Sequence, residues 1–381
     1  MSHGVLTVSM IHYHRLERRI VKDRDFELNS EDRLILGEAD RFARQQLAPL
    51  ATRMDDEEWW PEDLFPLLGE NGQLGLTIPS EYGGQGMDLF QAGLVGQAHA
   101  KWNHAAALSI GAHDNLCANN IYRNGNEEQR RRYLPGLSAG TLVGALGLTE
   151  PGAGSDALGS MATTALRVGD TYVLNGSKTF ITNGPIADVV LVYAKTNPEA
   201  GAHGISAFIV EAEFEGFTAS ATFRKMGFRG SPTGELVFSD CVVPAENLLG
   251  EENRGVAITM SGLDIERVYL ATGAIGLAER CLELSLEYAN TREQFGGPIA
   301  DFQMIQSKLA DMYTSLEAMR TFTYRALLAA RDMELGEGGR GDIHKLAAAS
   351  VLFGSDQLSR VVDDALQIHG GSGLMWESEV N

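Results

Sequence analysis

Glu266 is the residue whose sequence surroundings best suit acid–base catalysis. It falls in a helical stripe at spacings of three and four, which place side chains on one face of a helix. The other members of this stripe are Leu263, Leu270, Gly273 and Leu277. We predict that this face is buried, and burial raises the pKa of a carboxyl group toward the range of a general base. Arg267 points about 100° away, so it is not an automatic ion-pair partner. A structural buried ion pair, or a helix register shifted by one step, would explain the same pattern.

A glycine-rich segment at 146–156 is the second candidate. Its Gly152-x-Gly154-x-x-Ala157 spacing matches a permissive dinucleotide-binding fingerprint, which requires a helix after the glycines and an acidic residue about 20 positions further on. Strand-like residues follow instead, so we reject a dinucleotide-binding βαβ unit. Glycines still let backbone N–H groups approach a pyrophosphate, and Ser155 adds a hydroxyl donor. A simple glycine-rich turn is an equally good interpretation.

Phe180 and Thr182 form the third candidate. Alternate residues of a strand project to the same face, so these two side chains are predicted to lie side by side. An aromatic ring and a hydroxyl can flank a flat heterocycle and hydrogen-bond its edge. An ordinary half-buried strand face is the simpler interpretation of the same pair.

Helices are predicted on both sides of these candidates. From about residue 30 to 145, apolar residues recur at steps of three and four, and Asn29 or Ser30 can cap the first helix. At 302–330 apolar residues alternate in steps of three and four, a period typical of a four-helix bundle. A loop at 336–341 ends this helix, and another long helix is expected to end near Gly370.

Strands are predicted between the two helical regions. Residues 172–174 and 178–182 flank Asn175-Gly176, which is a strong hairpin signal. Further strands at 189–193 and 205–210 are separated by loops too short for crossover helices, so we predict an antiparallel sheet in an α+β protein. The predicted organisation is an extension at 1–27, expected to be disordered, then a helical domain at 28–145, a β domain at 146–255 and a helical domain at 256–381.

Composition narrows the class of protein. The 381 residues are 44% hydrophobic and 22% charged, the balance of a soluble globular protein. The net charge of −20 argues against nucleic acid and anionic membrane surfaces as partners. The negative charge does not exclude a phosphorylated small ligand, because a nest of backbone N–H groups can bind an anion in spite of the overall negative charge of the protein.

Cysteine spacing and hydropathy indicate the cellular compartment in which the protein works. The three cysteines, Cys117, Cys241 and Cys281, lie far apart, so neither a disulfide framework nor a metal site is expected. No apolar run approaches the roughly 20 residues of a membrane helix. We expect a bacterial cytoplasmic protein. The arginines near the N-terminus make a mitochondrial transit peptide the weaker alternative.

Several motifs together resemble the acyl-CoA dehydrogenase family, from about residue 28 to the end. The segment at 148–156 reads LTEPGAGSD and is similar to the first signature of the family. KMGFRGSP at 225–232, RxxFG from Arg292, Phe302-Gln303 and QxxGGxG from Gln367 follow in the expected order. Segments 111–117, 123–127 and 261–267 are most similar to the isovaleryl branch, in which the catalytic base lies where Glu266 stands.

The resemblance implies a role for each candidate. Glu266 would be the base, and its main-chain N–H would help a flavin hydroxyl to stabilise the thioester oxygen. FAD would be held by Leu148, Thr149, Gly154, Ser155, Phe180 and Thr182 and, across a subunit interface, by Arg292, Phe295, Gln303, Gln367, Gly370 and Gly371. Phe180 departs from the family, which usually has tryptophan there. Substrate would contact Ser155, Asp264, Arg267 and Gly273.

The implied activity is FAD-dependent α,β-dehydrogenation of a short, branched acyl-CoA to the 2-enoyl-CoA. Electrons would pass to an electron-transfer flavoprotein, and the chain would form a homo-oligomer, expected to be a tetramer. Medium- or long-chain substrates, a flavin oxidase or monooxygenase on the same fold, and a CoA-binding scaffold are the alternatives. The sequence stops at Asn381, about thirty residues before the family pattern ends, so we expect a C-terminally truncated bundle.

Overall fold

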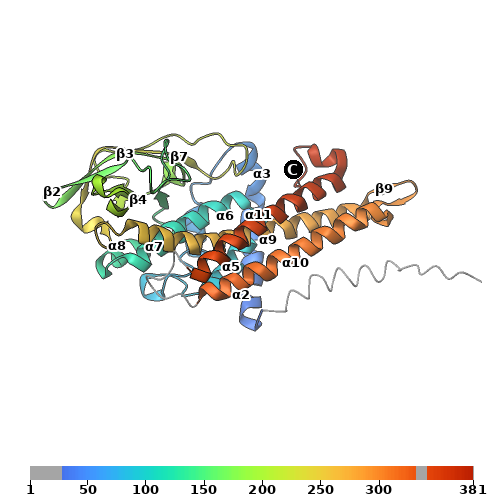
Figure 1. The fold of residues 1–381 in the computed structure, drawn as a ribbon. Coiled ribbons are helices and arrows are strands. Elements are labelled where there is room, and N and C mark those ends of the chain that lie inside the picture. Colours follow the sequence, from blue (N-terminus) through green and yellow to red (C-terminus); the bar gives the residue numbers. More distant parts are fainter. Residues whose placement is uncertain (1–27, 332–340, 381) are drawn as a thin grey trace, which may run out of the picture.

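The structure is a computed structural model that describes residues 28–331 and 341–380. The predicted α+β order of helices, a sheet and helices is confirmed, with the sheet beside one end of a long helical bundle (Figure 1). The predicted extension at 1–27 and most of the predicted loop at 336–341 lie outside the described residues.

The N-terminal region consists of short helices. They are α2 (Ser30–Phe42), α3 (Ala48–Asp56), α4 (Leu64–Glu70), α5 (Leu89–Trp102), α6 (His104–Gly111), α7 (Asn119–Asn124) and α8 (Glu127–Ser138), with π-helical turns at Ala43–Leu47 and Ala112–Ala118. The predicted cap of the first helix is confirmed, because the Asn29 side chain accepts hydrogen bonds from the N–H groups of Glu31 and Asp32. Asn103 has an extended backbone that separates α5 from α6, and its side chain caps α6.

The middle region forms one mixed sheet. Its strands are β1 (Gly144–Gly147), β2 (Thr164–Val168), β3 (Thr171–Thr182), β4 (Val189–Lys195), β5 (Ile205–Glu211), β6 (Phe217–Ala219), β7 (Thr233–Pro244) and β8 (Leu248–Leu249). The prediction of an antiparallel sheet holds for most pairs but is wrong for β4, which pairs in parallel with β1 and, at Thr164 and Lys195, with β2. Two parallel strands need a long connection between them. The chain between β1 and β4 includes the β2–β3 hairpin, which makes this connection long enough.

The predicted hairpin at Asn175-Gly176 is wrong. Both residues lie inside the continuous strand β3, at a bulge in its pairing with β7. Gly176 has a φ of 143°, and a Cβ there would lie 2.6 Å from the Thr163 hydroxyl oxygen, so the position requires glycine. The hairpin turn is at Gly169-Asp170, where Val168 and Thr171 pair and Gly169 has a φ of 60°.

Three long helices form the described C-terminal region. They are α9 (Gly255–Thr291), α10 (Gln303–Arg331) and α11 (Gly341–His369), and a small β9–β10 hairpin (Glu293–Gln294 and Gly297–Pro298) joins the first two. Helix α5 packs against α9 and α10, so the four-helix arrangement within the described residues draws one helix from the N-terminal region. None of the described helices is long and apolar enough to cross a bilayer.

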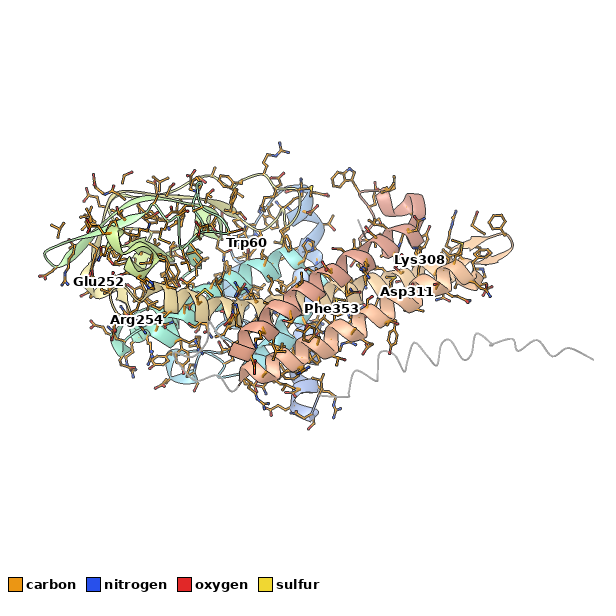
Figure 2. The ribbon with its side chains drawn as sticks, viewed as in Figure 1. Trp60, Glu252, Arg254, Lys308, Asp311 and Phe353 are labelled. Atoms are coloured by element: carbon orange, nitrogen blue, oxygen red, sulfur yellow. The ribbon has the colours of Figure 1, made fainter. Side chains whose placement is uncertain are left out.

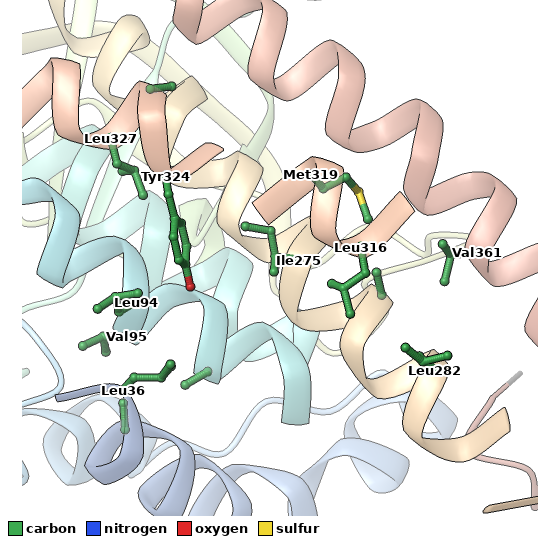
Figure 3. Packing of buried hydrophobic residues seen from close by; sticks show 14 of the residues in the cluster. Leu36, Leu94, Val95, Ile275, Leu282, Leu316, Met319, Tyr324, Leu327 and Val361 are labelled. Carbon is green, nitrogen blue, oxygen red and sulfur yellow. The ribbon is translucent and has the colours of Figure 1, made fainter. Parts of the chain in front are cut away.

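The bundle interior is built on the predicted stripe of α10. The side chains of Leu309, Met312, Leu316 and Met319 are buried, and Leu316 and Met319 face Ile275 of α9 (Figure 3). On the outside, Lys308 of α10 pairs with Asp364 of α11 (Figure 2). This bundle gives α9 a rigid frame, and Glu266 lies on that helix.

Candidate active site

A cavity of about 230 Å³ runs along α9, between α5 and α6 on one side and α11 on the other. Its lining includes Gly96, Ala100, His104, Ala107, Leu108, Gly111, Glu266, Leu270, Gly273, Leu277, Val351 and Leu358. Glu266, Leu270, Gly273 and Leu277 of the predicted stripe face this cavity, and the prediction that the whole stripe is buried is wrong, because Leu270 is 45% exposed. The buried faces of α9 carry other residues, such as Ile265, Val268 and Ile275.

Among residues 28–331 and 341–380, no cationic side chain forms an ion pair with the carboxyl group of Glu266. Its Oε2 atom is buried and has no hydrogen-bond partner within the described residues, and burial raises its pKa to about 8. Arg267 pairs instead with Asp264, at 3.2 Å from Nη1 to Oδ1, as its direction on the helix predicted. Neither predicted alternative, a structural ion pair or a shifted register, describes Glu266. It has the setting of a general base.

Tyr269 closes the space behind Glu266. A Cβ at Gly96 or Gly111 would lie 2.7 Å or 3.2 Å from the Tyr269 ring, so two glycines admit this ring between α9 and the helices opposite. Burial is the main cause that raises the pKa of Tyr269. Tyr269 thus contributes a buried aromatic ring to the wall of the cavity that contains Glu266.

The expected donor role of the Glu266 main chain does not fit the structure. Glu266 lies in the interior of α9, where its N–H is used in the helical hydrogen-bond ladder. This N–H is therefore not free to donate to a thioester oxygen, the role that the resemblance to the family implied.

The glycine-rich segment forms an exposed turn. Glu150 and Ala153 exchange backbone hydrogen bonds of 3.1 and 3.0 Å, and Gly154 and Ser155 are exposed beyond them. A Cβ at Gly152 or Gly154 would meet nothing within 4 Å, so these glycines are not required by contacts within the chain. The open approach to their backbone suits a pyrophosphate group.

Phe180 is held in an unusual conformation. Its φ is 59°, a strained value for an aromatic residue, and its side chain is 70% exposed. A bulge between Lys178 and Ile181 breaks the strand alternation, so the simple argument that placed Phe180 and Thr182 on one face does not apply. The other interpretation, an ordinary half-buried strand face, does not fit either, because an exposed ring on strained backbone points to a binding role.

Asn183 connects this strand to the cavity wall. Its buried side-chain amide donates to the carbonyl oxygens of Ser109, at 2.9 Å, and Gly144, at 3.1 Å. Ser109 follows Leu108, which lines the cavity. Asn183 thus links the end of β3 to the helix that carries Leu108 in the cavity wall.

Comparisons with known proteins agree with this arrangement. Family models for the N-terminal, middle and C-terminal domains of acyl-CoA dehydrogenase match residues 29–141, 145–241 and 253–381. The mitochondrial isovaleryl-CoA dehydrogenase of Oryza sativa is 44% identical over 88% of this chain and 81% of its own.

Solved structures share the fold. The butyryl-CoA dehydrogenase of Megasphaera elsdenii has a TM-score of 0.88 and 40% identity, covering 93% of this chain and 92% of its own. A chain from the structure described as the electron transferring flavoprotein of Acidaminococcus fermentans has a TM-score of 0.89 and 41% identity, with the same coverage. The chain belongs to the acyl-CoA dehydrogenase family. Members of the family are FAD-dependent oxidoreductases that act on CH–CH bonds.

The remaining predicted residues of this acyl-CoA dehydrogenase lie in different places. Gly273 lines the cavity, whereas Asp264 is buried beside it and its Oδ1 contacts His344 Nδ1 at 2.7 Å. The expected interface residues are exposed at the distal end of the bundle: Arg292, Phe295, Gln303, Gln367, Gly370 and Gly371 (Figure 1). Along α9, Arg292 is 26 residues from Glu266, or about 39 Å.

Sequence reasoning missed a buried ion pair under the glycine-rich turn. Glu150 and Lys178 meet at 2.8 Å although 28 residues separate them. Both residues belong to segments that the sequence analysis treated as candidates. Their pairing depends on the position of β3 against the turn, which the sequence does not show. Tyr269 was also missed, and its position three residues after Glu266 was the available signal.

Proposed function

We propose that this acyl-CoA dehydrogenase converts an acyl-CoA thioester to its 2-enoyl-CoA, with Glu266 as the base that removes the α-proton. The observation that carries the proposal is the Glu266 carboxyl group in an apolar cavity, whose buried Oε2 atom has no hydrogen-bond partner in the described part of the chain. FAD, when bound, supplies the acceptor for the β-hydride. Because burial raises the pKa of Glu266 to about 8, the protonated product state of this base is not penalised.

We infer that the exposed turn and β3 hold the cofactor. Gly154 and Ser155 would contact the pyrophosphate, Ser155 would also reach the CoA arm, and Leu148 and Thr149 would hold the flavin. Phe180 and Thr182 would cover one face of the ring. The support is the open glycine backbone and the strained, exposed Phe180.

We propose a short, branched acyl chain as substrate. Small residues line the cavity around Glu266, among them Gly111, Ala107, Ala100 and Gly273. A wide cavity close to the base suits a branching methyl group. The similarity to an isovaleryl-CoA dehydrogenase supports the same assignment. Asp264 and Arg267, which form an ion pair on α9, would contact the substrate at the edge of this site.

We also propose a homotetramer that passes electrons to an electron-transfer flavoprotein. Phe295 is 97% exposed and lies with Arg292 at the far end of the bundle, where a second copy would bring its own cofactor. The likeness to a chain from an electron transferring flavoprotein structure supports the acceptor.

A panel of acyl-CoAs tests this function. Under anaerobic conditions, isovaleryl-CoA should bleach the flavin faster than straight chains of eight or more carbons. Reoxidation should be fast with an electron-transfer flavoprotein and slow in air. Rapid reoxidation in air would favour an oxidase, and failure of every acyl-CoA to bleach the flavin would favour a CoA-binding scaffold.

A further inference from the structure

Glu150 and Lys178 form an ion pair that is almost completely removed from water. Their side chains are 4% and 0% exposed, and Lys178 Nζ lies 2.8 Å from Glu150 Oε1. We propose that this pair positions the FAD-binding turn, so that both residues are positioning residues for cofactor binding. The inference rests on the proposed function to the extent that the turn at 149–155 holds FAD.

One carboxylate fixes both ends of the loop that carries the turn. Glu150 stands at its start, and its two oxygens accept hydrogen bonds from the N–H groups of Ala162, at 2.6 Å, and Thr163, at 3.0 Å. The loop between them therefore closes on a single side chain. Gly154 and Ser155 project from this closed loop, so their place depends on Glu150.

Lys178 fixes the peptide before the turn. Its ammonium group donates to the Leu148 carbonyl oxygen at 3.3 Å, and the N–H of its neighbour Thr179 donates to the Thr149 carbonyl oxygen at 2.8 Å. In a trans peptide the C=O and the following N–H point in opposite directions. Holding the Leu148 carbonyl toward Lys178 therefore turns the Thr149 N–H away from it.

The same lysine links the turn to the aromatic face. Lys178 lies two residues before Phe180, at the start of the bulge that gives Phe180 its positive φ. The ion pair thus fixes the position of the turn relative to Phe180. A buried ion pair contributes little net stability compared with apolar residues of the same size, so stability alone does not account for it.

Three variants separate a positioning role from a stabilising one: Glu150→Gln, Lys178→Met and the double variant. Each single variant leaves a buried group without its partner, so the melting temperature of the apoprotein should fall. In the double variant both charges are gone and the melting temperature should recover most of the loss. FAD affinity, measured by titrating apoprotein with FAD, should stay at least ~10-fold weaker in all three, because the Leu148 carbonyl or the loop ends have lost a charged hydrogen-bond partner.

Lys101 is the control, a lysine likewise buried in an ion-pair cluster between α5 and α9: its side chain is 6% exposed, and its Nζ lies 2.8 Å from Glu279 Oε1 and 2.7 Å from Glu283 Oε1. The Lys101→Met variant should lower the melting temperature and leave FAD affinity within about twofold. FAD affinity that recovers together with the melting temperature in the double variant would overturn the proposal. So would unchanged affinity in all three variants. If the single variants do not fold, the double variant carries the test.

Gly154→Val tests the premise separately, since open space surrounds this position and only a bound ligand should resist the new side chain. Unchanged FAD affinity in Gly154→Val would show that the turn does not hold FAD and would overturn the proposal with it. Because the readout is FAD binding, an error in the role of Glu266 would leave all these results unaffected.

Discussion

The Oε2 atom of Glu266 is buried and has no hydrogen-bond partner in the part of the chain that the structure describes, and Arg267 on the same helix pairs with Asp264 instead. Such a carboxyl group costs the fold free energy whenever it is ionised. The cost is consistent with a base that must accept a proton from carbon, because the same desolvation raises its pKa to about 8.

This cost should be visible in the pH dependence of stability. Between the ordinary pKa of 4.5 and the folded value of about 8, the native protein keeps a proton on Glu266 that the unfolded chain releases. The free energy of unfolding should therefore fall as pH rises through this window, by about 1.4 kcal/mol per pH unit at most. Glu266→Gln lacks this proton, so its stability advantage over the wild type should grow from about pH 5 to about pH 8, as measured by urea unfolding. A gap that stays constant with pH would contradict the raised pKa.

Sequence reasoning was most successful for single residues with an unusual setting. An acidic residue in an apolar stripe singled out Glu266, which the structure places at a cavity, and the glycine-rich segment suggested a turn, which forms at Glu150–Ala153. The roles of these residues in catalysis and in FAD binding stay predictions. Sequence reasoning could not identify the ion pair of Glu150 and Lys178, because their meeting depends on how β3 lies against the turn. The positive φ of Phe180 was also beyond it, since no local residue preference favours that conformation for an aromatic side chain.

Strand β3 shows how a local signal can be misread at the level of an element. Asn175-Gly176 suits a hairpin turn, yet the hairpin forms at Gly169-Asp170 and Gly176 supports a bulge. Both sites need a positive φ, which is why the sequence alone did not separate them.

Substitutions at these two glycines should differ in effect. Gly176→Ala places a Cβ within 2.8 Å of the Thr163 Cα, so it should lower the free energy of unfolding by about 1–3 kcal/mol. Gly169→Asn is the control, because nothing lies within 4 Å of a Cβ there and asparagine tolerates its φ of 60°; it should cost less than about 0.5 kcal/mol. Equal losses in chemical denaturation would contradict this account of the bulge.

Helix α9 was predicted correctly as a helix, but the surroundings of its apolar stripe were not. Periodicity shows which residues share a face and cannot show whether a neighbour covers it. Here α5, α6 and α11 flank the face of Glu266, Leu270, Gly273 and Leu277 without closing over it, and a cavity remains.

Gly273 tests the use of that cavity. A Cβ there would lie 3.6 Å from the Ala100 Cβ, an ordinary contact, so Gly273→Ala should fold and retain most activity. Gly273→Leu fills space beside the base and should suppress flavin reduction by branched acyl-CoAs more than by straight ones. Stopped-flow bleaching with isovaleryl-CoA and with a straight-chain substrate measures the ratio of the two rates of flavin reduction. An unchanged ratio in Gly273→Leu would place the branch of the acyl chain elsewhere.

At the scale of the whole molecule, the cofactor residues expected from the sequence fall into two groups. One lies on the sheet near Glu266, and the other lies around Arg292, about 39 Å further along α9. In the homotetramer proposed above, two copies would bring the two groups to one flavin. Phe295, exposed on the hairpin between α9 and α10, would then lie in the contact between copies.

Arg292→Ala should therefore weaken FAD binding and the oligomer together. Loss of a charge-assisted contact to pyrophosphate corresponds to about 1.5–3 kcal/mol of binding free energy. Flavin content after gel filtration and the elution volume measure the two effects in one experiment. Arg131→Ala is the control, because Arg131 is an exposed arginine on α8 in the N-terminal region, and it should change neither. Loss of neither property in Arg292→Ala would contradict the shared site.

Anaerobic stopped-flow mixing of the FAD-loaded Glu266→Gln variant with an acyl-CoA that reduces the wild type tests the role of Glu266 most directly. The amide keeps the size of the side chain and cannot accept the α-proton, so flavin bleaching should slow by at least ~10³-fold while bound FAD and the fold are unchanged. Bleaching of the variant at a rate close to that of the wild type would show that another group removes the proton and would contradict the central claim.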